Sequence, residues 1–351
     1  MFVAGLGCAG CAGARLAAVK KPLAMDRALA EGEGPTDVVE RAMPAEPTKQ
    51  GQAVAAAQAG WGWFRWLLFA PTLVFLAAMT LFPLFYSLGV SLFRFVIGAA
   101  PQFVGLGNYI ALITHPEFLS VTRVTLKITV VAVAIEIVLG LLLGFALHQR
   151  LPAIGLFRLI VFLPMMLAPL VVGLFWRFLL DQTFGLINYL IGVLGGAPIP
   201  WLVHPSYALA SVIIVDVWQW TPFVVLLVVA GLGTVPQDLL QAAALDRASL
   251  GMRLRHIFWP YLRFPLLLAV LFRSIDTLKM FDVPFILTGG GPGNFTTTLS
   301  LLGYRYHFQF FQISMAAAVS WVIVILINIV ANVLVNLLTP KRPLEQVHTG
   351  L

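Results

Sequence analysis

Charged and amide side chains interrupt several long apolar stretches of this sequence. Glu136 stands near the middle of one stretch, and Asp216 and Gln219 stand in another beside Trp218. A charge at the centre of a bilayer costs about 2.5–3.5 kcal/mol on insertion scales, so such side chains usually face a cavity or a partner. Carboxylate, amide and aromatic groups together suit hydrogen bonding to and stacking on a polar solute such as a sugar. These four residues are therefore candidates to line a translocation pathway, with an aromatic belt at the membrane interface as the alternative for Trp218.

Two further polar sets recur at helical spacing. Arg273, Asp276 and Lys279 are three residues apart, and opposite charges at that spacing on a helix can pair with one another. We therefore expect an internal salt-bridged set there rather than a binding site. Asn328 and Asn332 are four residues apart in the last apolar stretch, where amides either hydrogen bond to another helix or line a pathway.

Patterns that would indicate catalysis are missing from the sequence. The six histidines form no metal-ligand pair, no grouping of Ser, His and Asp stands out, and no Gly-Lys pair could build a Walker A loop for phosphates. Cys8 and Cys11 form a single CxxC in an Ala/Gly-rich stretch without a second pair, which we do not interpret as a metal or redox site. A membrane-embedded enzyme would need clustered carboxylates or metal ligands at one membrane face. The sequence therefore predicts no catalytic residue, no metal site and no cofactor.

The overall composition is that of a membrane protein. Of the 351 residues, 60% are hydrophobic and 11% are charged, and the mean hydropathy is +0.93. Soluble proteins carry about a quarter charged residues, so this chain has too little polar surface for a soluble enzyme. The net charge of +7 fits lysines and arginines in cytoplasmic loops and does not by itself indicate nucleic-acid binding.

Six apolar stretches are long enough to cross a bilayer, whose hydrocarbon core needs about 20 residues of helix. They are approximately 66–90, 124–147, 157–180, 208–232, 264–286 and 313–338. Lysines and arginines follow the second, fourth and sixth stretches, whereas 181–207 has none, so both termini should be cytoplasmic. We expect an all-α integral membrane domain at 64–339, a disordered N-terminal extension at 1–63 and a C-terminal tail at 340–351.

The connection at about 233–263, called the coupling segment below, is amphipathic rather than simply polar. Pro236 and Asp238 suit a first helical turn, and apolar residues recur after them at helical spacing. These are Leu240, Ala243, Leu250, Leu254 and Ile257. An apolar stripe on the cytoplasmic side needs a surface to cover it. Either the protein's own helices or lipid headgroups cover the stripe, or it docks into a cleft on a cytoplasmic partner.

The coupling segment resembles the EAA loop of binding-protein-dependent ABC importer permeases. The pattern of that loop is Glu-Ala-Ala, three residues, Gly, nine residues and Ile-x-Leu-Pro. The positions that match are Ala242, Ala243, Asp246, Ala248, Ile257 and Pro260. Gln241, Arg247 and Trp259 replace the Glu, Gly and Leu. The resemblance implies a short helix pair that inserts into an ATP-hydrolysing subunit, with a turn at residue 247 that Gly would allow and Arg disfavours.

Other segments support the same resemblance in the same order. Leu106–Tyr109 is similar to the Gly-Leu-Glu-Asn-Tyr segment before the second span of sugar permeases. The third span and its exit are matched by Arg158, Pro164, Trp176, Gly185 and Asn188. Phe281–Asp282 and Leu287–Asn294 resemble the Leu-Thr-x-Gly-Gly-Pro signature of the carbohydrate branch. The resemblance covers about residues 64–339.

The sequence is therefore identified as a member of the maltose- and glycerol-phosphate-type permeases of carbohydrate ABC importers. The resemblance implies the six-helix fold of type I (MetI-like) permeases with cytoplasmic coupling helices, in the bacterial inner membrane. It implies three partners besides the lipid bilayer: a second homologous permease, a pair of cytoplasmic ATPase subunits and an extracytoplasmic sugar-binding protein. It also places Gly290, Gly291 and Pro292 in a loop near the exit of the pathway, where a plain extracytoplasmic turn is the alternative.

An ion-driven secondary carrier for a small polar solute is the main alternative function. In that case Glu136 or Asp216 would be the carboxylate that couples transport to the ion gradient. The EAA-like loop favours an ATPase partner, because a secondary carrier needs no cytoplasmic docking helix. The motifs are shared by permeases for oligosaccharides, polyols and glycerol phosphates, so they do not identify the sugar.

Overall fold

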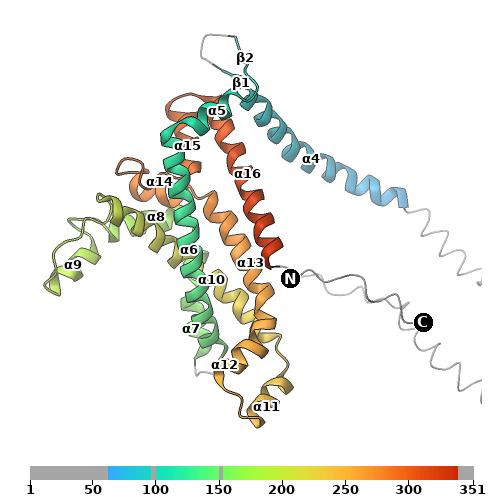
Figure 1. Ribbon diagram of the computed structural model, residues 1–351, viewed down its shortest axis with the longest axis vertical. Coiled ribbons are helices and arrows are strands. Elements are labelled where there is room, and N and C mark those ends of the chain that lie inside the picture. The colour runs from blue at the N-terminus through green and yellow to red at the C-terminus, as the bar shows by residue number, and fades with distance from the viewer. Residues whose placement is uncertain (1–61, 96–99, 150–152, 339–351) are drawn as a thin grey trace, which may run out of the picture. The chain divides into compact units, whose positions relative to one another are not determined.

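The computed structural model describes residues 62–95, 100–149 and 153–338 (Figure 1). The chain divides into two units, 1–80 and 81–351, and each is described by itself. Apart from its last two residues, the predicted N-terminal extension lies outside the described residues, as do the CxxC of Cys8 and Cys11 and the predicted C-terminal tail.

Helices dominate the described residues, as the long apolar stretches predict. The described part of the first unit belongs to α4, Gly62–Leu92, which continues into the second unit. There β1 (Phe93–Arg94) and β2 (Gln102–Phe103) form a short antiparallel pair. The helices that follow are α5 (Gly107–Thr114), α6 (Pro116–His148), α7 (Ile154–Phe162), α8 (Pro169–Leu179), α9 (Leu186–Val193), α10 (Pro205–Gly233), α11 (Gln237–Leu245), α12 (Leu250–Arg253), α13 (Trp259–Leu278), α14 (Asp282–Thr288), α15 (Leu299–Tyr304) and α16 (Ile313–Leu338). The 3-10 turn η1 (Pro164–Met166) and the π-helical turns η2 (Leu254–Phe258) and η3 (Arg305–Gln309) join some of them.

Within the described residues, five helical segments are long and apolar enough to cross a membrane. They are Trp66–Leu92, Pro116–His148, Pro205–Gly233, Leu250–Leu278 and Ile313–Asn336. The third predicted span, 157–180, is instead divided among α7, η1 and α8. Pro164 and Pro169 cause this division, because a proline has no N–H to continue the helical hydrogen bonds and fits best in the first turn of a new element.

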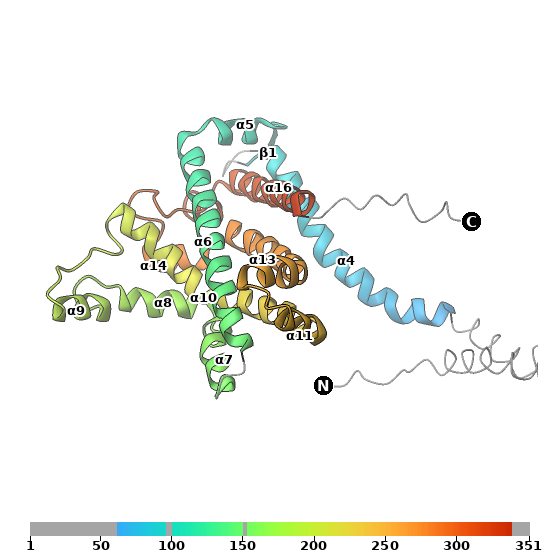
Figure 2. The ribbon, with the colours of Figure 1, turned by 60° about the horizontal axis from the view of Figure 1, so that its bottom comes forward.

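Helices α6 and α10 pack together at glycines (Figure 2). A Cβ atom on Gly140 would overlap Val224, and one on Gly144 would overlap Val228. Small residues four apart on a membrane helix allow the backbones of two helices to approach closely. This contact brings the middle of α6 against α10. It fixes the relative positions of Glu136 and Asp216 along the two helix axes.

Helix α13 packs against both α6 and α10. Buried residues shared by α10 and α13 are Val224, Val228, Leu232, Leu262, Leu266 and Ala269. At Gly231 the two helices are so close that a Cβ would lie 2.9 Å from Pro265 Cγ. At the other end of the unit, α5, α15 and α16 pack around the start of α6, far from α11 and α12 (Figure 1). The second unit is therefore a helical bundle with the coupling segment at one end.

The close approach of α6 and α10 predicts the effect of two small substitutions. Changing Gly140 and Gly144 to Ala should lower the melting temperature of the purified protein in detergent, because overpacking costs about 1–3 kcal/mol at each site. Gly89→Ala in α4 is the matched control, since no atom lies within 4 Å of the added Cβ there. That change should be neutral or stabilising, because Ala exceeds Gly in helix propensity by about 1 kcal/mol. If Gly89→Ala lowers the melting temperature as much as the changes at Gly140 and Gly144 do, the close approach of α6 and α10 is contradicted.

Candidate functional site

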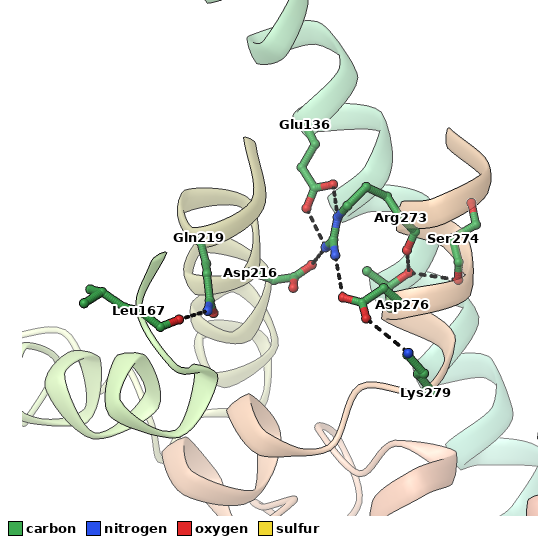
Figure 3. Close-up of polar contacts among 9 residues, drawn as sticks. Glu136, Leu167, Asp216, Gln219, Arg273, Ser274, Asp276 and Lys279 are labelled. Atoms are coloured by element: carbon green, nitrogen blue, oxygen red, sulfur yellow. Dashed lines mark hydrogen bonds and ion pairs between the residues drawn. The ribbon is translucent and has the colours of Figure 1, made fainter. Parts of the chain in front are cut away.

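A buried arginine joins carboxylates from three helices (Figure 3). Arg273 of α13 donates from Nε and Nη2 to the two carboxylate oxygens of Glu136 of α6, at 2.7 and 2.9 Å. The same Nη2 donates to Asp216 of α10 at 2.8 Å, and Nη1 donates to Asp276 at 2.8 Å. Arg273, Glu136 and Asp216 are buried. We call these four residues the Arg273 network; it joins α6, α10 and α13 at one point.

The energetics of the Arg273 network follow from its burial. The planar guanidinium matches the two oxygens of Glu136, which gives this pair strong and directional hydrogen bonds. Replacing a whole buried ion pair by apolar groups is often neutral, but removing one partner leaves an uncompensated charge that costs about 3–5 kcal/mol. The buried carboxylates therefore need the charge of Arg273 for compensation, and Arg273 needs theirs.

The sequence predicted that Arg273, Asp276 and Lys279 satisfy one another. The structure contains that set, since Arg273 binds Asp276 and Lys279 Nζ lies 3.6 Å from Asp276 Oδ1. It also shows two further partners of Arg273, which lie 57 and 137 residues away in the sequence. Asp276 is thus the exposed member of a larger network, and the exposed Lys279 pairs with it.

Asp276 and Lys279 border an open cavity between α10 and α13. Their side chains are 39% and 58% exposed. The cavity has a volume of about 280 Å³. The rest of its lining is Trp220, Phe223, Phe272, Arg273 and Ile275. The ring centroid of Trp220 lies 4.9 Å from Arg273 Cζ, which is a cation–π contact. Carboxylate, ammonium and aromatic surfaces therefore meet in this α10–α13 cavity.

Trp218 and Gln219 lie apart from the α10–α13 cavity. Trp218 packs edge-on against Trp176 of α8, with ring centroids 5.6 Å apart, and lines a different, mainly apolar cavity of about 490 Å³. Gln219 is buried and donates from Nε2 to the carbonyl of Leu167 at 3.2 Å, as Figure 3 shows. Its Oε1 has no hydrogen-bond partner among the described residues. The structure thus brings Glu136 and Asp216 together and places Trp218 elsewhere; the pathway role of all four remains a prediction.

Asn328 and Asn332 lie on the exposed surface of α16. Asn328 Nδ2 donates to the carbonyl of Val324 at 2.8 Å, and Asn332 Nδ2 donates to the carbonyl of Asn328 at 2.9 Å. Within the described part of the chain, neither amide bonds to a second helix. The structure therefore leaves these amides at a surface that another molecule could contact.

The coupling segment contains the helix pair that the sequence predicts. Helix α11 ends in a Schellman-type cap, in which the N–H of Ala248 donates to the carbonyl of Ala243 at 2.9 Å and the N–H of Arg247 donates to that of Ala244 at 3.2 Å. Arg247 has the left-handed backbone conformation of this cap, with φ of +50°. Helix α12 begins after Ser249, whose hydroxyl accepts from the N–H of Met252.

Only part of the predicted apolar stripe of the coupling segment packs inward. Within the stripe, Ala243 is buried, Leu240 and Ile257 are half-buried, and Leu250 and Leu254 are exposed, Leu250 to 77%. Outside the stripe, Phe258 packs against Phe145 of α6 with ring centroids 5.4 Å apart, and Leu245 is 85% exposed. Of the other EAA-like residues, Gln241, Ala242, Asp246, Arg247 and Pro260 are exposed, and Ala248 and Ile257 are half-buried. The segment therefore keeps apolar surface free and is not sunk among the described helices of its own chain.

The predicted exit loop, residues 290–292, belongs to a tightly bonded turn after α14. Gly289 and Gly290 have φ of +61° and +91°, and a Cβ on Gly290 would lie 2.5 Å from Thr297 Oγ1. Arg305 donates to the carbonyl of Gly289 at 2.7 Å. Gly290 is thus required by both backbone conformation and space. Gly290 therefore has a structural role in this turn. The place of residues 290–292 near the exit of a pathway stays a prediction.

Sequence reasoning did not select Trp220, Phe223 and Phe272 as site residues. A signal for two of them was present, because Trp220 and Phe223 follow Asp216 by four and seven residues and therefore share its face of a helix. Phe272 lies in another helix, and only the packing of α10 and α13 brings it to the cavity.

Comparisons with known proteins agree on one family. The family described as "Binding-protein-dependent transport system inner membrane component" matches residues 136–342. A probable ABC transporter permease protein of Sinorhizobium fredii is 42% identical over 266 residues, which cover 76% of this chain and 85% of that protein. A trehalose/maltose transport system permease protein of Thermococcus litoralis is 37% identical, with 69% and 82% covered. A trehalose transport system permease protein of Mycobacterium tuberculosis is 35% identical, with 79% and 89% covered.

Solved structures agree on the fold. A chain of a bacterial ABC transporter involved in the import of the acidic polysaccharide alginate matches with a TM-score of 0.70 at 16% sequence identity, covering 81% of this chain and 98% of that one. The likeness confirms the predicted all-α fold of an ABC importer permease. At this identity it concerns the fold alone.

The Arg273 network predicts a large loss of stability when its cation is removed. Arg273→Met leaves Glu136 and Asp216 without their cation, and the free energy of unfolding should fall by about 3–5 kcal/mol. Adding Glu136→Gln and Asp216→Asn to the same protein should recover most of the lost melting temperature. Lys279→Met is the matched control, because an exposed ion pair contributes about 0–1 kcal/mol. If the control loses as much stability as Arg273→Met, or if the triple variant recovers none of it, the network does not join the helices as described.

Proposed function

Because this chain belongs to the family of binding-protein-dependent transport system inner membrane components, we propose that it is the transmembrane permease subunit of an ATP-driven carbohydrate importer. The similar proteins of T. litoralis and M. tuberculosis are named as permeases for trehalose/maltose and for trehalose, which supports a carbohydrate as the substrate. The family is one of transport components rather than enzymes. Kinship with ABC transporter permeases also favours ATP over an ion gradient as the source of energy.

The α10–α13 cavity is the observation that carries the proposal of a sugar pathway. Asp276 and Lys279 expose charge in a membrane-length bundle, which is tolerated where they face water or a partner rather than lipid. A sugar ring offers apolar C–H faces for stacking on Trp220 and Phe223 and hydroxyl groups for hydrogen bonding to the two charged side chains. Glu136 and Asp216 act behind this surface by holding Arg273, which in turn orients Asp276.

A second, homologous permease completes the pathway in this proposal. The cavity is open on one side of α10 and α13, so this chain supplies only part of its wall. The exposed amides of Asn328 and Asn332 on α16 would hydrogen bond to that second subunit or line the pathway with it.

The coupling segment docks on a cytoplasmic ATP-hydrolysing subunit in this proposal, and one continuous helix transmits its motion. Leu250–Leu278 runs through α12, η2 and α13, and it carries both the exposed Leu250 and the residues of the cavity. When two ATPase subunits close on nucleotide, displacement of the segment tilts this helix. The tilt changes which side of the membrane reaches the cavity, which is alternating access.

The opposite face receives an extracytoplasmic sugar-binding protein in this proposal. The predicted outer connections meet at a cavity of about 420 Å³ whose lining combines apolar residues with polar ones such as Asp181 and Thr288. Backbone N–H groups of Phe184 and Thr183 donate to Asp181 and hold the pKa of its carboxyl below the ordinary value, so it is ionised at neutral pH. The protein then lies in the inner membrane with both termini in the cytoplasm, as the loop charges predict.

Two tryptophans on α10 test the position of the pathway. Trp220→Ala should lower uptake of the transported sugar about tenfold or more without loss of assembly, because stacking on this ring is lost. Trp218→Ala is the matched control and should have a smaller effect, since that ring packs against Trp176. The measurement is uptake of radiolabelled trehalose, maltose or lactose by cells that carry the complete transporter. A larger loss for Trp218→Ala would place the pathway beside Trp218, which is one of the pathway candidates selected from the sequence.

An exposed leucine tests the docking role of the coupling segment. Leu245→Asp places a charge on a side chain that is 85% exposed, and it should abolish co-purification of the ATPase subunits while leaving the permease folded. Leu194→Asp, at the end of α9, is the matched control because Leu194 is 86% exposed. Retention of the ATPase by Leu245→Asp would contradict docking at this segment.

A further inference from the structure

Arg247 has a backbone conformation that is unfavourable for any residue with a Cβ. Its φ is +50°, at the cap position of α11 where helices usually end in Gly. The left-handed conformation is unfavourable for a non-glycine residue, because Cβ comes too close to the following carbonyl oxygen. The cap requires this conformation, which Gly would adopt without strain, whereas Arg247 adopts it with a Cβ.

Contacts within the described chain do not compensate for this strain. The side chain of Arg247 is exposed, and no described carboxylate or carbonyl oxygen accepts a hydrogen bond from its guanidinium. The nearby Arg253 differs, because its Nε donates to the carbonyl of Ala248 at 3.0 Å and braces the turn from inside. Residues with a strained backbone cluster at functional sites, so the exposed guanidinium of Arg247 is a candidate for a functional contact.

The surface around Arg247 combines apolar and basic groups. Leu245 and Leu250 are highly exposed on either side of it in the sequence. Arg255 adds a second exposed positive charge, and Asp246 is the acidic neighbour. Exposed apolar side chains beside an arginine are typical of protein–protein interfaces, in which arginine is enriched. Such a surface complements an apolar cleft with a carboxylate at its rim.

We propose that the guanidinium of Arg247 pairs with a carboxylate on the ATP-hydrolysing subunit, at the edge of the cleft that receives Leu245 and Leu250. This inference rests on the proposed function, because it adds a specific charged contact to the docking of the coupling segment. The pair forms at the margin of a desolvated interface, where it compensates for the backbone strain and selects the cognate ATPase. In a complex with an ATPase that lacks this carboxylate, Arg247 would lose water without gaining a partner. Such an ATPase would therefore bind this permease less tightly than a permease with Gly at this position.

The test uses the complete permease pair in detergent and measures binding of its purified ATPase subunit at low and at high salt. Arg247→Gly should bind the ATPase about tenfold more weakly at low salt, and the salt dependence of binding should become flatter. The melting temperature of the permease alone should stay equal or rise, because the glycine removes the strain. Arg247→Lys should keep most of the affinity and its salt dependence.

Two control variants separate the possible outcomes. Arg255→Gln removes one positive charge from the same segment without touching the cap; an equal effect would assign the result to general charge and overturn the proposal. If Arg247→Gly binds like the parent protein while Leu245→Asp loses the ATPase, the arginine contact is absent and the docking role stands. If Leu245→Asp also retains the ATPase, the docking role fails and the arginine contact fails with it.

An anionic lipid headgroup is the other ligand class for an exposed arginine near a membrane. In that case the defect of Arg247→Gly would be absent in detergent and in vesicles of phosphatidylcholine. It would appear only in vesicles that contain phosphatidylglycerol. That result would overturn the proposal and assign Arg247 to the lipid surface.

Discussion

Arg273 binds carboxylates from α6, α10 and α13 in a part of the bundle where its charge is buried. A single cation that serves two buried acidic groups restricts the helices that carry them, because a shift along any helix axis would separate a charge from its partner. The glycine contacts between α6 and α10 also restrict these helices, because they hold Glu136 and Asp216 at matching positions along the two helix axes. The exposed part of the network then faces the α10–α13 cavity. The interaction that holds the helices together is therefore also the base of the surface that we assign to the substrate.

The structure distinguishes charged side chains that are buried among the helices from charged side chains that border a cavity. Glu136 and Asp216 look like pathway residues in the sequence because a charge inside an apolar helix suggests a cavity. In the structure both carboxylates accept hydrogen bonds from Arg273. The groups that border open space are Asp276, Lys279 and the aromatic side chains near them. In our proposal Glu136 and Asp216 hold Arg273, which contacts Asp276 at the cavity, and a direct pathway role of the two buried carboxylates remains a prediction.

The sequence predicted most of the helices because hydropathy and loop charge depend on local composition. The family resemblance implied the helix pair of the coupling segment and a turn at residue 247, although arginine disfavours that turn. The division of the third span was visible as Pro164 and Pro169, but hydropathy does not distinguish one broken span from a continuous one. The partners of Arg273 on α6 and α10 could not be predicted, since a spacing rule within one helix says nothing of residues 57 or 137 positions away. Phe272 was missed for the same reason, because it reaches the cavity only through the packing of two helices.

The place where Pro265 meets Gly231 has a mechanical consequence for the continuous helix from Leu250 to Leu278. At about 1.5 Å per residue, some 22 Å of helix lie between this contact and Leu250, and about 16 Å lie between it and Asp276. In the proposed mechanism, a helix that pivots as a rigid body at this contact would move its two ends in opposite directions, and its shorter arm would move Asp276 by less than Leu250. A large displacement of the coupling segment would then become a smaller, reversed displacement at the charged wall of the cavity.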